Sequence, residues 1–183
     1  MSILKVARLG HPVLRAKARP VTPDEIKSPA FQALVDDMFE TMAEYSGIGL
    51  AGPQVHQGLR VFVAGVRESD TISPMSDDAE MPLVTIVNPE ITFLHDALVE
   101  AWEGCLIIKD IRGLMQRPVT IKVRALDRHG RRIEIAASGL PARVIQHETD
   151  HLDGVLFFDR MKSLETLAFM DEFRRYWSKD DEA

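Results

Sequence analysis

The sequence has 183 residues, of which 45% are hydrophobic and 27% charged, with 10 prolines and 11 glycines. This is the composition of a globular chain with its own core, and it excludes collagen-like, coiled-coil and disordered proteins. The net charge of −6 argues against direct reading of nucleic acid, because such a surface repels phosphates. No apolar run reaches the ~20 residues of a membrane span, and the N-terminus lacks the pattern of a secretory signal. We therefore expect a cytoplasmic protein that does not bind membranes.

Turn signals and one amphipathic pattern organise the N-terminal part of the chain. Residues 1–21 show no clear period and are expected to form an extended arm. The sequence Thr22-Pro23-Asp24-Glu25 has the pattern of a capping box, and Ser28-Pro29 marks a second helix start. The residues that follow predict a helix with one buried stripe, ending near Ser46-Gly47. The stripe consists of Phe31, Leu34, Val35, Met38, Phe39 and Met42.

Strand patterns dominate the middle of the chain. Residues 47–54 are expected to form a loop of small residues, and the acidic residues 67–82 a solvated loop. Runs rich in β-branched residues predict strands at 59–66, 83–87, 90–94, 119–125 and 132–136. The last two strands flank the turn sequence at residues 127–130, which indicates a hairpin.

Two helices are expected in the C-terminal part. Ser138 is a suitable N-cap for a helix that runs to about Leu152, with Gly154 just past its end. A second helix is expected to begin at Ser163 and to pack an apolar stripe, ending at Trp177, on the body of the protein. With no repeat and no linker, we expect one α+β domain over residues 1–183. Antiparallel strands would surround a central helix, with a C-terminal helix beside them.

The central helix carries the motif His147-Glu148-Thr149-Asp150-His151. Residues four apart lie on one helical face, so both imidazoles can reach one metal ion while Glu148 handles a proton. A solvated or core position explains either histidine alone. It does not explain the pair with an adjacent carboxylate inside a capped helix. We therefore predict that the central helix binds a metal.

A catalytic metal normally takes three protein ligands and leaves one position for water. The third ligand is expected to be a thiolate, an imidazole or a carboxylate elsewhere in the chain. Cys105 is the single cysteine, so it forms no disulfide within the chain. A lone cysteine is more often a small core residue, but Gly104 gives the backbone room beside it and no other candidate has a comparable context. A Cys-His-His set suits Zn²⁺ or Fe²⁺ better than Mg²⁺ or Ca²⁺.

Three segments together carry a resemblance to a known family. They are Gly47-Ile-Gly-Leu-Ala-Gly-Pro-Gln54, Glu103-Gly-Cys-Leu106 and Gln146-His-Glu-Thr-Asp-His151. Each resembles one signature motif of the peptide deformylases, in the family's order, and residues 9–14 are similar as well. The likeness extends to about Arg160. The histidine motif alone would also fit many metallopeptidases, whereas the three motifs together are specific.

This resemblance implies removal of the formyl group from formyl-methionine at the N-terminus of nascent proteins, in the cytoplasm of bacteria. Its partners would be N-formylmethionyl peptides and nascent chains, and it allows a contact with the ribosome. Cys105, His147 and His151 would hold one divalent metal ion. Fe²⁺ is the expected ion, and Zn²⁺ or Ni²⁺ is compatible with the same ligands.

The resemblance also implies roles for residues around the metal. Glu148 would act first as general base and then as general acid. The side-chain amide of Gln54 and the backbone N–H of Leu106 would bind the developing oxyanion. Ile48 and Gly49 would line the substrate channel, Gly49 through its backbone.

Several charged residues near these motifs have weaker claims. Glu103 and Arg112 are expected to pair across the cysteine loop, in a structural role. Asp150 either orients a ligand from behind or is a surface acid. Arg143 lies one helical turn before His147 and is expected to border the pocket for the methionine side chain.

Two departures from the family pattern keep alternatives open. Gly52 stands where the family usually has alanine, and Ile107 where bacterial members usually have serine. Ile107 would reshape the surroundings of Cys105 and leaves catalytic efficiency in doubt. One alternative is therefore a catalytically weak or silent deformylase-like protein that binds metal or nascent chains. The other is a different metal amidase or peptidase, against which a thiolate ligand argues.

Overall fold

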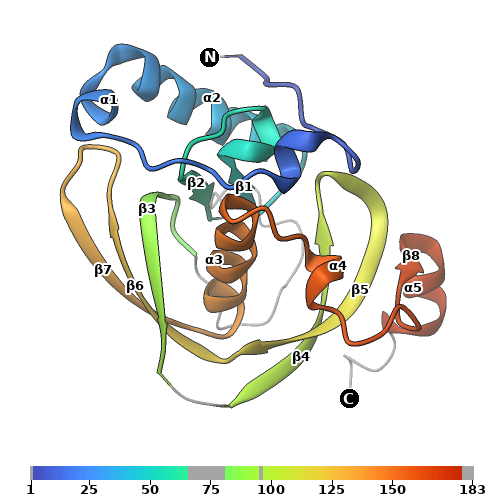
Figure 1. Cartoon of the computed structure of the whole chain (residues 1–183). Helices are drawn as coiled ribbons and strands as arrows, with labels where there is room; N and C mark the ends of the chain where they lie inside the picture. The colour runs from blue at the N-terminus through green and yellow to red at the C-terminus, as the bar shows by residue number, and fades with distance from the viewer. Residues whose placement is uncertain (1, 66–80, 95–96, 179–183) are drawn as a thin grey trace.

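The computed structural model describes residues 2–65, 81–94 and 97–178. Its central element is α3 (Gly139–Leu152), and Figure 1 shows strands of two antiparallel sheets on either side of this helix. The α+β class with antiparallel strands around a central helix is therefore confirmed. The helix positions the site because its two histidines face the space between the sheets.

The first sheet has the strand order β1-β2-β3-β6-β7, and every neighbouring pair in it is antiparallel. Its strands are β1 (Gly49–Ala51), β2 (Val61–Ala64), β3 (Val84–Phe93), β6 (Thr120–Leu126) and β7 (Arg132–Ser138). The predicted hairpin is confirmed by β6 and β7, which pair from Thr120↔Ser138 to Leu126↔Arg132.

The second sheet has the order β4-β5-β8 and is also antiparallel. It consists of β4 (Leu98–Cys105), β5 (Ile108–Pro118) and β8 (Ala168–Phe169). The sequence analysis assigned no strand to the residues of β5. Lysine, aspartate, arginine, glycine and proline in this segment lower its intrinsic strand preference, and pairing with β4 overrides that preference.

The two predicted helix starts near the N-terminus give two separate helices, α1 (Pro23–Lys27) and α2 (Pro29–Glu44). In the capping box, the Thr22 hydroxyl accepts a hydrogen bond from the Glu25 N–H at 3.3 Å, and Glu25 accepts from the Thr22 N–H at 2.9 Å. Ser28 caps α2 by accepting from the N–H of Phe31 at 3.2 Å. Both starts are confirmed, and the arm before them is extended except for a 3₁₀ helix over Pro12–Arg15.

The strands expected at 83–87 and 90–94 are one strand, β3, with an irregularity between Val87 and Glu90. Asn88 lies in this bulge with a φ of 52°, a left-handed conformation that asparagine tolerates better than most residues. Its side chain exchanges hydrogen bonds with the backbone of Val21. The expected loop at 47–54 also contains more order than predicted, namely β1 and a 3₁₀ helix over Gly52–Val55. The predicted loop at 67–82 lies outside the described residues, except for its last two positions.

The prediction of a helix starting at Ser163 is wrong. The chain instead forms α4 (Phe157–Arg160), the short strand β8, and then α5 (Met170–Tyr176). The edge of β5 offers backbone hydrogen bonds to β8, and this tertiary pairing prevails over the local helical pattern. Ser138 occupies the N-cap position of α3, but its side chain makes no capping hydrogen bond.

The main core lies between α3 and the first sheet. Ala142, Ile145 and Leu152 of the helix pack in one buried cluster with Phe62 and Ile86. This apolar face fixes the rotation of α3 and turns its histidine face toward β4. In the described part of the chain, no helix is both long and apolar enough to cross a membrane.

Candidate metal centre and active site

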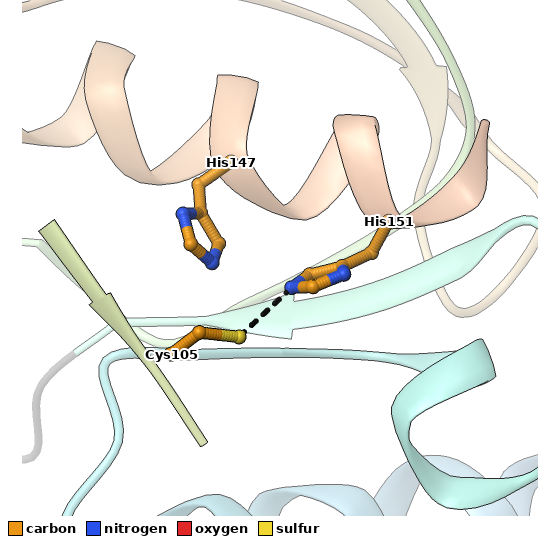
Figure 2. Close-up of side chains that lie close together, drawn as sticks. All are labelled: Cys105, His147 and His151. Atoms are coloured by element: carbon orange, nitrogen blue, oxygen red, sulfur yellow. Dashed lines mark hydrogen bonds between the residues drawn. The ribbon is translucent and has the colours of Figure 1, made fainter. Parts of the chain in front are cut away.

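Cys105, His147 and His151 converge on one point, as Figure 2 shows. One ligand atom from each residue lies within 4.8 Å of the other two. The Cys105 Sγ and His151 Nε2 atoms are 3.1 Å apart, and the two imidazole centroids are 4.9 Å apart. The structure therefore brings together the three residues that the sequence predicts as metal ligands.

Local structure explains this convergence. His147 and His151 are four residues apart on α3 and so share one helical face. Cys105 is the last residue of β4, just after a register shift between Glu103 and Cys105. Such an irregularity turns the strand locally and changes the direction of its side chains. The thiol thereby faces the helix.

Glu103 fixes the orientation of His147. Its Oε2 atom lies 2.9 Å from His147 Nδ1, which leaves Nε2 as the nitrogen available to a metal. Burial alone would raise the pKa of Glu103, but hydrogen bonds from His147 and Arg117 outweigh it and lower the pKa. The lowered pKa favours an ionised Glu103, which accepts a hydrogen bond from His147 Nδ1 and so orients the imidazole.

A buried ionic network supports Glu103 in turn. Arg117 donates to both of its carboxylate oxygens, at 2.6 and 2.9 Å, and Arg143 donates to Oε1 at 2.7 Å. Arg117 also donates to Asp150 at 2.9 Å, and Arg160 binds the same carboxylate. Asp150 is therefore not a surface acid, because it accepts a hydrogen bond from Arg117, which in turn binds Glu103. The expected pairing of Glu103 with an exposed Arg112 is wrong, because two buried arginines occupy this carboxylate.

Gln54 contacts the Cys105 sulfur through its side-chain amide. Its Oε1 accepts a hydrogen bond from the Ala51 N–H at 2.6 Å, and this bond directs Nε2 toward Cys105 Sγ at 3.5 Å. Gln54 is 1% exposed, so the direction of its amide is fixed by buried contacts. The 3₁₀ helix Gly52–Val55 that carries it needs glycine at its first position, because a Cβ on Gly52 would lie 2.8 Å from the Leu59 carbonyl oxygen. This contact accounts for one of the two departures from the family pattern.

Glu148 is buried beside the two histidines. Its Oε2 atom has no hydrogen-bond partner among the described residues, an arrangement that fits a group awaiting water or substrate. Burial raises the pKa of Glu148 to about 7, against the opposing charges of His147 and Arg117. A pKa near neutrality suits a residue that both accepts and returns a proton. Gly49 faces this carboxylate so closely that a Cβ there would overlap it.

These groups line one cavity of about 550 Å³. Of the residues predicted to be functional, Ile48, Gly49, Gln54, Cys105, Leu106, His147 and Glu148 lie on its wall. His151 is 1% exposed and contacts the Cys105 sulfur from within the core. Arg143 also lines the cavity, and its place beside the methionine side chain of a substrate stays a prediction. Ile107 is 2% exposed and packs in an apolar cluster with Leu14 and Met115, so its side chain points into the core.

The cavity wall also contains residues that were not predicted to be functional, including Tyr45, Trp102, Lys109 and Met170. Lys109 Nζ lies 4.5 Å from the centre of the Tyr45 ring, in a cation–π contact across the cavity. No local motif marks these residues. They reach the cavity through strand pairing and through the end of α2.

The residues present fit a divalent transition metal. The donor set is one sulfur and two nitrogens, which favours Zn²⁺, Fe²⁺ and related ions over Mg²⁺ or Ca²⁺. The carboxylate behind His147 is the outer partner that metal-bound histidines usually have. The Glu148 Oε2 atom has no hydrogen-bond partner among the described residues, so it is available to accept a proton.

Comparison with known proteins agrees with this geometry. The family model for polypeptide deformylase matches residues 3–167. The chain belongs to the peptide deformylase family. It is 38% identical over 179 residues to peptide deformylase 2 of Nostoc sp., with 97% of both chains covered. It is also 39% identical to peptide deformylase 1 of Nitrosomonas europaea, over 92% of this chain and 93% of that one.

Solved deformylase structures share the fold. A Met-Ala-Ser-bound class I type b peptide deformylase from Acinetobacter baumannii superimposes with a TM-score of 0.81 and 39% identity, covering 88% of this chain and 100% of that one. The deformylase from Thermotoga maritima gives a TM-score of 0.78 and 35% identity, covering 89% and 100%. Members of this deformylase family depend on a metal, and the Cys-His-His centre is where this chain would bind one.

Proposed function

We propose that this deformylase hydrolyses the formyl amide of N-formylmethionyl peptides and nascent chains at the Cys105-His147-His151 centre. The observation that carries the proposal is the convergence of these three ligands on one point, at a cavity whose wall also includes the buried Glu148 carboxylate and Gln54. The Met-Ala-Ser bound to the Acinetobacter baumannii relative has the chemistry of a deformylated product, which supports the same substrate class for this chain.

A divalent metal bound there supplies Lewis-acid chemistry, which lowers the pKa of water to about 7 and makes it a nucleophile. Glu148 takes a proton from the attacking water as a C–O bond forms at the formyl carbon. Gln54 Nε2 and the Leu106 N–H donate to the formyl oxygen as it gains negative charge. Glu148 then returns the proton to the amine nitrogen as the C–N bond breaks. The products are formate and a peptide with a free amino terminus.

Substrate passage fits the shape of the cavity wall. Ile48 and the backbone of Gly49 would guide the formyl end of the substrate toward Glu148, since a side chain on Gly49 would fill that space. Fe²⁺ is the proposed physiological ion, as the resemblance to the family implies, and the same donor set also suits Zn²⁺ and Ni²⁺. Binding to the ribosome and a cytoplasmic location stay predictions.

A formate-release assay tests the proposal. Protein purified without oxygen and loaded with Fe²⁺ or Ni²⁺ is expected to release formate from formyl-Met-Ala, and Glu148→Ala is the matched inactive control. Unformylated Met-Ala-Ser, incubated in parallel, is expected to stay intact. Binding of formyl-Met-Ala without formate above the control would favour the silent protein considered above. Cleavage of internal peptide bonds would favour a peptidase.

A further inference from the structure

The C-terminal segment of the described chain lies beyond the region that the family model matches, which ends at residue 167. Its first two residues form β8, which pairs with β5 through Ile111↔Phe169 and Arg112↔Ala168. Figure 1 shows β8 and α5 along the outer side of β5. We call this segment, residues 168–177, the outer wall.

An aromatic cluster attaches the outer wall to the strand that leads to the metal centre. The Trp102 ring of β4 lies 4.9 Å from the Phe173 ring and 5.4 Å from the Trp177 ring, centroid to centroid. Trp102 immediately precedes Glu103, which orients His147. The outer wall is therefore attached next to the residue that orients His147, although it lies at the exposed edge of the sheet.

This attachment brings Met170 to the cavity. Met170 is half-buried and lines the cavity together with Trp102, whereas the preceding Phe169 is 65% exposed and does not line it. Methionine is apolar, flexible and polarizable, so it adapts to side chains of different shape. The two neighbouring side chains thus differ in environment, since Met170 lines the cavity and Phe169 is exposed to solvent.

Arg112 marks the same side of the cavity. Its guanidinium lies against Gly104, where a Cβ would overlap it. Burial lowers the pKa of Arg112, and the charge of Arg174 on α5 adds to this effect. Its hydrogen bond goes to the Ile111 carbonyl, and it forms no ion pair within the described residues. Met170 of the outer wall and the positively charged Arg112 of β5 therefore both line this cavity.

We propose that the outer wall contacts the peptide residues that follow the formyl-methionine, with Met170 as a specificity-determining residue that favours apolar side chains there. The proposal rests on the proposed function. The formyl end of the substrate has to reach Glu148 at the buried end of the cavity. A nascent chain must then leave toward solvent, and Met170 lines the cavity while its half-buried side chain is also reached by solvent.

The test compares kcat and KM for formyl-Met-Leu-Leu and formyl-Met-Ser-Ser. Wild-type protein is expected to prefer the Leu-Leu peptide. Met170→Ala is expected to reduce kcat/KM for that peptide about five- to tenfold through KM, and to leave the Ser-Ser peptide unchanged, because only an apolar contact is lost. Met170→Leu keeps an apolar side chain and is expected to retain the preference. Phe169→Ala is the matched control, since this neighbour faces solvent.

Two outcomes would overturn the inference. One is an unchanged Leu-Leu to Ser-Ser ratio in Met170→Ala, and the other is an equal loss for both peptides while the thermal midpoint stays at the wild-type value. These results leave the proposed function intact, because formate is still released. Formate from no peptide with metal-loaded wild-type protein would instead overturn the proposed function itself.

Discussion

The two ends of the cavity are built by different physical means. At the inner end, charged side chains from β4, β5 and α3 are buried and joined by several hydrogen bonds each, as with Glu103 and Arg117. At the outer wall, α5 has no buried residue and is attached through the rings of Phe173 and Trp177. The difference shows that buried, charged hydrogen bonds hold the inner end of the cavity, whereas contacts between aromatic rings hold the outer wall.

The largest expected effects concern the metal centre. Cys105→Ala is expected to abolish both metal binding and formate release, because only two imidazoles are left to hold the ion. Glu148→Ala is expected to keep its metal and to lose turnover by about 10²–10⁴-fold, the usual contribution of general acid–base catalysis. Metal analysis and formate assays on the same anaerobic samples measure both.

Together, the two variants distinguish the proposed metal ligand Cys105 from the proposed general base Glu148. Full metal content with near-normal turnover in Cys105→Ala would remove the thiolate from the ligand set. Loss of metal from Glu148→Ala would instead show that the carboxylate contributes to binding. Either result would weaken the view that the inner end is fixed by the three predicted ligands.

The next effect concerns the stability of the inner end. Arg117→Met leaves Glu103 and Asp150 buried without their shared partner, which is expected to lower the free energy of unfolding by about 3–5 kcal/mol. Arg124→Met is the matched control, because the Arg124 side chain is 71% exposed and its bond to Glu134 is expected to contribute only about 0–1 kcal/mol. Urea unfolding of both variants measures the contrast, and equal losses would contradict it.

The convergence of the three predicted ligand residues could be expected from the sequence because their signals are local. His147 and His151 share a helical face through a fixed spacing, and Cys105 is the single cysteine. The ionic network that orients His147 through Glu103 could not be predicted in this way. Glu103 meets Arg117 only through the pairing of β4 with β5, and no pattern along the chain marked β5 as a strand.

The same reason explains the misread C-terminal segment. Residues 163–177 have a helical apolar pattern, but the hydrogen bonds offered by the edge of β5 decide that Ala168 and Phe169 form a strand. Because β8 pairs with β5, the next residue, Met170, lies at the cavity. The grouping of the proposed catalytic residues could therefore be expected from motif and spacing, whereas the other residues that line the cavity depend on which strands pair.

A smaller effect tests whether the outer wall unfolds by itself. The chain has two tryptophans, Trp102 and Trp177, and both belong to the aromatic cluster, so tryptophan fluorescence reports on its docking. Phe173→Ala is expected to weaken docking by about 0.5–1.5 kcal/mol. In urea, the fluorescence transition should move to lower concentration, while the circular dichroism transition of the core stays in place.

The control for this experiment lies on the same helix. Tyr176 is 64% exposed and outside the cluster around Trp102, so Tyr176→Ala is expected to leave both transitions where they are in the wild type. Coincident transitions in Phe173→Ala, shifted together, would show that α5 unfolds with the core. In that case the outer wall would be as firmly fixed as the inner end.

The smallest effect is expected at a surface ion pair remote from the cavity. Glu25 accepts hydrogen bonds from Arg19 and Thr22, which lower its pKa from 4.5 to about 2. A lowered pKa in the folded state stabilises the protein above pH 4.5, and this contribution declines as the pH falls toward 2. Glu25→Gln should therefore have a slightly lower urea midpoint than wild type at pH 7. The gap should narrow steadily when the measurement is repeated below pH 4.5, because the wild-type carboxylate is then being protonated. Two results would contradict the distinction between buried and exposed ion pairs in this protein. One is a difference in urea midpoint between Glu25→Gln and wild type as large as that for Arg117→Met, and the other is a difference that grows as the pH falls.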